Sequence, residues 1–181
     1  MLDWLIHLEQ LLPTLLENYG VWLYAILFLI IFAETASVFM FFLPGDSLLI
    51  AIGALCFTSP SLHLPYMIVL LFVAAVLGYG VNYYTGKLLG FKFFHQHSRI
   101  FKPKYISKTN HYFVKHGGKT IMIARFIPFV RSFAPFAAGA AHMNKTKFML
   151  YNIVGGWIWI ALLIGVGYGA GNLLSILFDV M

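Results

Sequence analysis

Four long apolar segments dominate this chain of 181 residues and restrict how it can fold. They cover about 20–58, 64–86, 120–142 and 148–174, and a helix needs roughly 20 apolar residues to cross the hydrocarbon core of a bilayer. The sequence is 61% hydrophobic and only 10% charged, whereas soluble domains are about 45–50% apolar and about 25% charged. These values predict one all-α integral membrane domain over 1–181. They argue against a disordered chain, a disulfide scaffold and a water-soluble enzyme.

The second and fourth segments have the length of single spans, but the first and third do not. The first is too long for one span and short for two, and Pro44–Asp46 interrupts it. The third contains two arginines and two prolines. Irregular backbone at membrane depth is tolerated only where protein buries it or where it lines a wet cavity. We therefore expect re-entrant helical hairpins over 20–58 and 120–142.

The basic residues indicate the orientation of these segments. Residues 1–86 contain no Lys or Arg, and all twelve basic residues lie between Lys87 and Lys147. The positive-inside rule then predicts that 87–119 is cytoplasmic. Because Lys119 precedes the third segment and Lys145 follows it, both ends of that hairpin are expected on the cytoplasmic side. The first hairpin would enter from the opposite side.

Weak internal repetition supports a two-fold layout. Gly78–Gly80 recurs as 167–169, and Gly53-Ala54 recurs as 139–140. Repeat 1, about 1–90, would contain an interfacial amphipathic helix, a hairpin and a span; repeat 2, about 91–181, would begin with a cytoplasmic amphipathic segment. An odd number of crossings in each repeat gives an inverted repeat, which is typical of transporters. Chance matching between glycine-rich helices remains the alternative.

Four charged residues lie inside the apolar hairpins: Glu34 and Asp46 in the first, and Arg125 and Arg131 in the second. A charge at the centre of a bilayer costs about 2.5–3.5 kcal/mol on insertion scales. Two acids in one hairpin balance two arginines in the other, so we expect pairing, a water-filled cavity, or both. Arginine suits a phosphate because its planar fork donates two hydrogen bonds together. Pro128 would turn both guanidinium groups toward one cavity.

Each of these residues also has a purely structural interpretation. Asp46 could act as the N-cap of a helix over Ser47–Leu55. Glu34 could pair with an arginine only to hold the hairpins together, and Arg125 could bind free carbonyl groups. Of the two arginines, Arg131 is expected to be the main ligand contact.

Polar residues near the hairpins could support the charged cluster. Asn82 and Asn152 lie within the spans, where hydrogen bonding between helices is the default expectation. Half-helices that end at Pro44-Gly45 and near Pro135 would direct backbone dipoles at the cavity. No metal site and no cofactor are expected.

Two sequence stretches resemble a known family. FAETASVFMFFLPGDSLLIAIGAL and KHGGKTIMIARFIPFVRSFAPFAAGAAHM are similar to the DedA family of bacterial inner-membrane proteins, and the resemblance covers about 18–172. It implies lipid transport linked to the proton motive force, with undecaprenyl phosphate as the leading substrate. It also implies functional acids at Glu34 and Asp46 and functional arginines at Arg125 and Arg131.

The chain departs from the family pattern at two places. Tyr79 stands where close relatives carry an acid, so a proton-binding role at this position is in question. Longer family members have a further span and a basic tail, whereas this chain ends at Met181 with only Asp179 charged nearby. Its C-terminus is therefore expected to be periplasmic.

Together these features predict a multi-pass protein of the bacterial plasma membrane that moves a lipid phosphate. A proton-coupled antiporter for small cations and a non-specific phospholipid scramblase remain alternatives. An enzyme is not expected, because no GxSxG or HExxH motif is present. The expected partners are a polyprenyl phosphate or phospholipid and the bilayer itself, with a homo-oligomer left open and nucleic acid not expected.

Overall fold

The computed structural model describes residues 22–38, 40, 45–58, 62–96 and 118–180. These residues form helices and no strand. A helix over Trp22–Ala36 is followed by α2 (Gly45–Thr58), α3 (Leu64–Gln96), α5 (Lys119–Ala124), α6 (Pro128–Ala140) and α7 (Lys145–Val180). The predicted interfacial helix in the first 20 residues, Pro44 and most of the cytoplasmic amphipathic segment lie outside the described residues.

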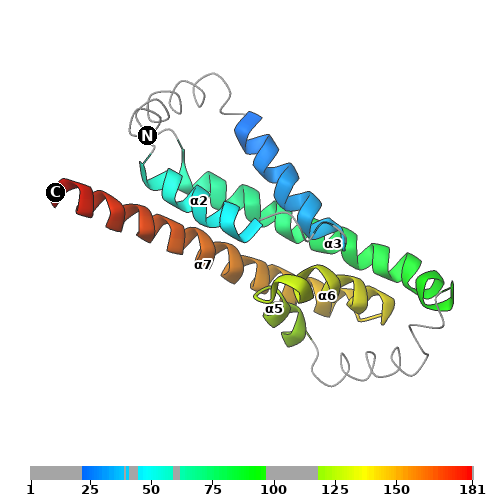
Figure 1. Ribbon diagram of the computed structural model, residues 1–181. Coiled ribbons are helices and arrows are strands. Elements are labelled where there is room, and N and C mark those ends of the chain that lie inside the picture. Colours follow the sequence, from blue (N-terminus) through cyan, green and yellow to red (C-terminus); the bar gives the residue numbers. More distant parts are fainter. Residues whose placement is uncertain (1–21, 39, 41–44, 59–61, 97–117, 181) are drawn as a thin grey trace.

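Two helices are long and apolar enough to cross a bilayer: α3 over Leu64–Leu89 and α7 over Lys145–Leu173. Both predicted spans are thus confirmed as helices of suitable length, although each helix extends beyond its predicted bounds. The two helices run in opposite directions through the molecule (Figure 1). The helices Trp22–Ala36 and α2 lie toward the C-terminal end of α7, and α5 and α6 lie toward the opposite end.

The first and third apolar segments are each divided into two helices. The break in the third segment falls at Arg125–Ile127, because Pro128 is the first residue of α6 and has no N–H to continue the preceding helix. Ile127 takes an extended conformation, with φ −114° and ψ 108°, as expected before a proline. The prediction of a helix end near Pro135 is wrong, because α6 continues through it to Ala140. In that position proline removes only one backbone hydrogen bond, and packing on α3 supports the helix.

A tight turn joins α6 to α7. His142 has a positive φ of 53°, and the N–H groups of His142 and Met143 donate to the carbonyls of Gly139 and Ala138. This pattern is a Schellman motif, which satisfies carbonyls at the end of α6. The Asn144 side chain then accepts from the backbone N–H of Thr146 at 2.9 Å and caps the start of α7.

Helices from opposite halves of the sequence pack together through glycines. The helix α2 packs along α7, and α6 packs along α3. A Cβ on Gly53 would overlap the carbonyl oxygen of Ile164, and one on Gly139 would overlap that of Tyr83. Glycine is therefore needed at both crossings for the close approach of two helix backbones.

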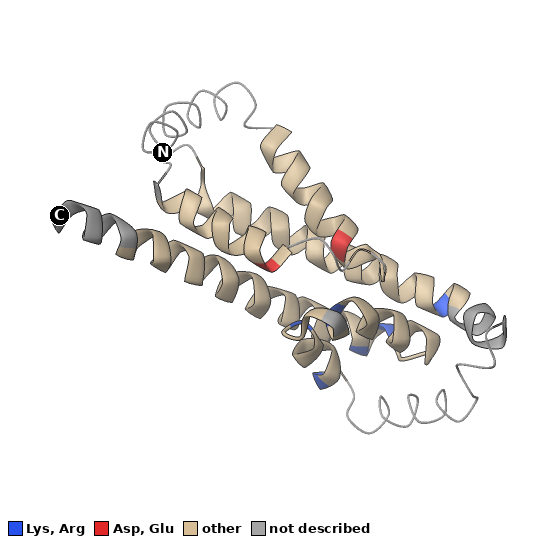
Figure 2. Cartoon of the chain, viewed as in Figure 1, with Lys and Arg blue, Asp and Glu red and all other residues tan. Residues whose placement is uncertain are grey.

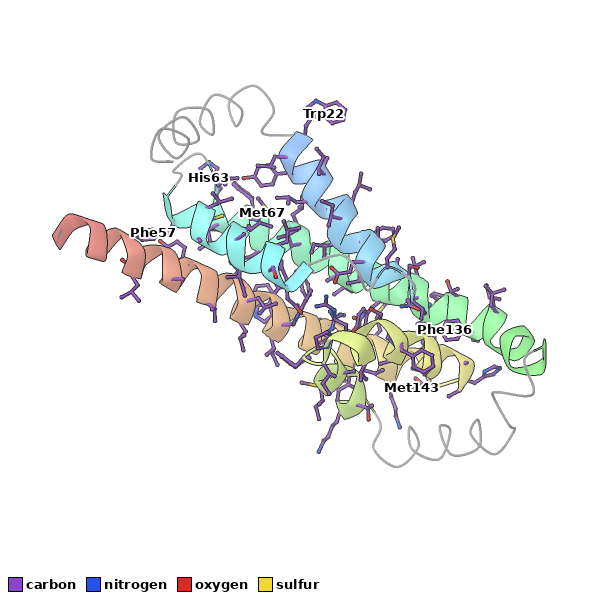
Figure 3. All side chains as sticks on the ribbon, viewed as in Figure 1. Trp22, Phe57, His63, Met67, Phe136 and Met143 are labelled. Atoms are coloured by element: carbon purple, nitrogen blue, oxygen red, sulfur yellow. The ribbon has the colours of Figure 1, made fainter. Side chains whose placement is uncertain are left out.

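The interior contains two apolar clusters. The first joins the Trp22–Ala36 helix, α2, and parts of α3 and α7, and includes the fully buried Met67 (Figure 3). The second joins the later part of α3 to α5, α6 and the start of α7. On α7, the buried Asn152 lies between Phe148 of the second cluster and Trp159 of the first. The candidate site lies where the two clusters meet.

The outer surface of the long helices is also apolar. Trp22, 66% exposed, points away from the other helices (Figure 3). Exposed large apolar side chains recur every three or four residues along one face of α3, at Tyr66, Val69, Val73, Leu77, Val81, Tyr84 and Leu88. Soluble monomers rarely expose a continuous apolar face of this kind, and contact with lipid explains it.

Candidate functional site

The four predicted charged residues come from four different helical elements. Glu34 lies near the end of the Trp22–Ala36 helix, and Asp46 lies in the first turn of α2. Arg125 is the C-cap of α5, and Arg131 lies near the start of α6. All four therefore lie at or near the breaks that divide the two apolar segments.

Arg131 joins the two segments by a double ion pair. One terminal nitrogen of its guanidinium donates to Glu34 and the other donates to Asp46. Arg131 is 6% exposed and Glu34 is 1% exposed, whereas the side chain of Asp46 is 38% exposed. Arg131 thus holds one acid in the interior and one at an accessible position. The predicted pairing between the acids and the arginines is confirmed for this residue.

The helix bounds do not match the N-cap interpretation of Asp46, an interpretation that is compatible with a role in the cluster. The helix α2 begins at Gly45, so Asp46 already lies inside its first turn. Its Oδ1 accepts from Arg131 and from the indole Nε1 of Trp159, the latter at 3.1 Å. Its carboxylate is therefore directed toward the other elements of the cluster.

Gly45 allows the start of α2 to approach Glu34. A Cβ at this position would overlap the carboxylate of Glu34. The expectation that Gly45 supports the charged cluster therefore has a steric basis. Pro44, which was also expected to support the cluster, lies outside the described residues.

Arg125 has a different environment from Arg131. It is 2% exposed, and its Nη2 donates to the side-chain and backbone oxygens of Asn152. Its guanidinium carbon lies 3.8 Å from the centroid of the Tyr79 ring, a cation–π arrangement. Within the described residues no acid forms an ion pair with it. The backbone oxygen of Asn152, at 3.4 Å, lies within α7 and is not a free carbonyl at a helix break, so the suggestion that Arg125 binds free carbonyls of the hairpin stays a prediction.

Asn82 and Asn152 connect helices, as predicted. The Asn82 amide nitrogen donates to the carbonyl of Thr35 at 3.3 Å and to that of Ser132 at 2.9 Å. It thereby links both divided segments to α3. The amide nitrogen of Asn152 donates to the carbonyl of Val76 at 3.0 Å and so links α7 to α3. Both side chains are fully buried.

Sequence reasoning missed Trp159 as part of the site and treated Tyr79 only as a departure from a family pattern. Trp159 is 2% exposed, and its ring centroid lies 5.4 Å from the guanidinium carbon of Arg131 and 5.8 Å from that of Arg125. A buried tryptophan usually needs a partner for its N–H. That rule could have identified Trp159, although it could not have identified Asp46 as the partner.

Two arginines and two acids give the cluster a net charge of zero when all four are ionised. In Figure 2 the acids drawn in red lie near the middle of the molecule, and the basic residues drawn in blue extend from there toward the end opposite the C-terminus. Among the described residues, no group of three or more His, Cys, Asp or Glu could hold a metal ion. The buried guanidinium groups can bind anions, and the two carboxylates can take up and release protons.

Comparisons with known proteins also indicate a membrane protein. The VTT domain profile matches residues 43–169. The chain is 46% identical to Protein DedA of Escherichia coli strain K12 over 175 residues, which are 96% of this chain and 80% of that protein. It is 39% identical to Inner membrane protein YqjA of the same strain over 151 residues, which are 83% and 68% of the two chains.

An uncharacterized membrane protein of Mycobacterium leprae is 38% identical over 144 residues, which are 79% of this chain and 64% of that protein. No solved structure matches the chain. The domain profile covers more than half of the chain, and the similarity to DedA extends over 96% of it. The chain is therefore a membrane protein of the DedA family, with a VTT domain over residues 43–169.

Proposed function

We propose that this protein transports a lipid phosphate across the bacterial plasma membrane, with undecaprenyl phosphate as the preferred substrate and protons as the coupling ion. The observation that carries the proposal is the double ion pair of Arg131 with Glu34 and Asp46. A buried guanidinium held by two carboxylates is a site at which a phosphate and the acids compete for the same donors.

Proton coupling follows from this competition. An acid that takes up a proton loses its charge and weakens its bond to Arg131, so donors become available to the phosphate. When the acid releases its proton, it again competes for the guanidinium and favours release of the substrate. Asp46, the more exposed of the two acids, would exchange protons with water, and Glu34 would hold the arginine from the interior side.

The packing of the helices supports an inverted-repeat architecture for this transport. Ile50 and Gly53 on α2 meet α7 at Gly167 and Ile164, respectively. On the other side, Phe136 and Gly139 on α6 meet α3 at Gly86 and Tyr83, respectively, so the two contact positions are three residues apart on all four helices. The latter two contacts repeat the first two. In these contacts Gly167 of the second repeat corresponds to Gly86 of the first. The repeated Gly-Tyr-Gly sequence would instead make Gly167 correspond to Gly78.

Two divided segments that exchange partners between halves suit alternating access to a central site. In this proposal the helices Trp22–Ala36 and α2 form one re-entrant hairpin and α5 and α6 form the other, since each of these helices is shorter than a span. The end of the molecule that carries Lys87, Lys119 and Lys145 would face the cytoplasm. The lipid tail would stay in the bilayer beside the apolar outer face of α3.

The test is a leaflet-accessibility assay in vesicles that contain the purified full chain. Undecaprenyl phosphate would be detected by a reagent that reaches only the outer leaflet, with and without a pH gradient. We expect the wild-type protein to equilibrate the lipid between leaflets and to do so faster with an inward proton gradient. Arg131→Lys and Glu34→Gln should slow transport at least tenfold, because a lysine cannot hold two groups with a planar fork and a glutamine cannot release a proton.

Lys147→Gln is a matched control, since Lys147 is an exposed basic residue outside the cluster. Equal movement of a fluorescent phosphatidylglycerol would indicate a scramblase instead. Proton-driven cation flux in vesicles without polyprenyl phosphate would indicate a cation antiporter. Transport by both cluster variants at the wild-type rate would overturn the proposal.

A further inference from the structure

The two arginines of the cluster are not equivalent as anion sites. Both acids of the cluster pair with Arg131, and within the described residues Arg125 has only neutral partners. A cation that is 2% exposed and lacks a counter-ion is unfavourable in a low-dielectric interior. Its environment therefore favours the approach of a negative charge, and no acid must first be displaced.

Two buried hydrogen-bond donors at this arginine also lack a partner: the hydroxyl of Tyr79 and the Nε of Arg125 itself. Buried polar groups are nearly always hydrogen-bonded, to protein or to something bound. The Nη2 of Arg125 is already held by Asn152, and the guanidinium covers the ring that carries the Tyr79 hydroxyl. Both free donors thus belong to one stacked pair of side chains, and the complementary partner is an oxygen with a negative charge.

We propose that Tyr79 is a substrate-contacting residue whose hydroxyl, together with the Nε of Arg125, binds an anionic oxygen of the phosphate. This inference rests on the proposed transport of a lipid phosphate. A phosphate monoester has several charged oxygens, so one can bind this pair while another binds Arg131 after an acid has released it. Arg125 and Tyr79 would then receive the headgroup, and Arg131 would couple its passage to protons.

A structural role for Tyr79 makes a different prediction from a role in binding. If Tyr79 only provides an aromatic surface for Arg125, then its ring matters and its hydroxyl does not. Tyr79→Phe separates these roles, because it keeps the ring and removes only the oxygen. The hydroxyl has no partner in the protein, so its removal should leave the melting temperature of the ligand-free protein unchanged or slightly raised.

The experiment is calorimetric titration of the full chain in detergent with three probes: farnesyl phosphate, farnesol and inorganic phosphate. We expect the wild-type protein to bind farnesyl phosphate and not farnesol. Tyr79→Phe should bind farnesyl phosphate roughly 10- to 100-fold more weakly, as expected for the loss of a hydrogen bond to a charged group. Tyr84→Phe is the matched control, since Tyr84 lies on the same helix and is 40% exposed.

The outcomes distinguish this inference from the function on which it rests. If the wild-type protein and Tyr79→Phe bind farnesyl phosphate equally well, the hydroxyl does not contact the ligand, and the inference is wrong while lipid-phosphate binding stands. If the wild-type protein does not bind farnesyl phosphate, the proposed function and the inference both fail. Binding of inorganic phosphate that weakens in parallel in Tyr79→Phe would show that the pair recognises the phosphate alone, independently of the lipid tail.

Discussion

Arg131 and Arg125 lie on either side of the same helix break and both face the ring of Trp159, yet their surroundings differ in charge. Arg131 is held by two carboxylates from the first apolar segment. Arg125 is held by an amide and an aromatic ring, Asn152 and Tyr79, from the two long helices. The partners of Arg131 are therefore carboxylates, which can take up and release protons. The partners of Arg125 are an amide and an aromatic ring, which carry no charge.

This difference teaches that equal numbers of acids and arginines do not mean pairing one to one. With both acids on Arg131, that triad has a net negative charge, and Arg125 carries the compensating positive charge at a separate place. An anion at Arg125 leaves the triad intact, whereas an anion at Arg131 must compete with it. Substitution of Arg131 and substitution of Arg125 should therefore have different effects on stability.

The largest effect is expected for Arg131→Met. Without the guanidinium, Glu34 remains as a carboxylate that is 1% exposed and has no cation, and removal of one partner of a buried pair costs about 3–5 kcal/mol. Unfolding in mixed SDS and neutral detergent measures this loss. The double variant Glu34→Gln with Arg131→Met should recover most of the stability, because it removes the buried carboxylate that has lost its cation. Failure of the second substitution to restore stability would contradict the pairing.

A smaller effect is expected for Arg125→Met. The partners left behind are neutral, so the loss is that of hydrogen bonds to a charged donor, about 1–3 kcal/mol. The same unfolding assay applies, and here an added Glu34→Gln substitution should give no recovery. If Arg125→Met were as damaging as Arg131→Met, or if Glu34→Gln rescued it, the two sites would be coupled more closely than their contacts indicate.

The smallest effects are expected from two glycines, one beside each site. Gly45→Ala would place a methyl group against the carboxylate of Glu34 and should destabilise the protein by about 1 kcal/mol while slowing transport. Gly156→Ala would place a methyl group 3.4 Å from Nη2 of Arg125, at the border of an ordinary van der Waals contact. We therefore expect a change of less than about 1 kcal/mol. If Gly45→Ala and Gly156→Ala changed the free energy of unfolding and the transport rate equally, the proposed difference between the surroundings of Arg131 and Arg125 would be contradicted.

Much of the fold was predictable from local sequence. The lengths of the apolar runs predicted both long helices, and Pro128 predicted where the third segment is interrupted. The first segment is also divided, but its preceding helix ends at Ala36, and Gly45 and Asp46 already belong to α2. Pro135 was misleading because proline destabilises an interior helical position without forbidding it, and α6 is supported by its contact with α3. The asparagines within the spans were correctly expected to join helices.

The sequence by itself determined which charged residues must be buried, since Glu34, Arg125 and Arg131 lie in runs too apolar to remain in water. Only the tertiary structure decided how they are shared. The pairs that form join residues 85 and 97 positions apart, and Tyr79 and Trp159 acquire their roles because α3 and α7 pass beside the breaks. Pairing at such separation depends on the packing of helices, and no local pattern of residues encodes which of two arginines both acids will reach.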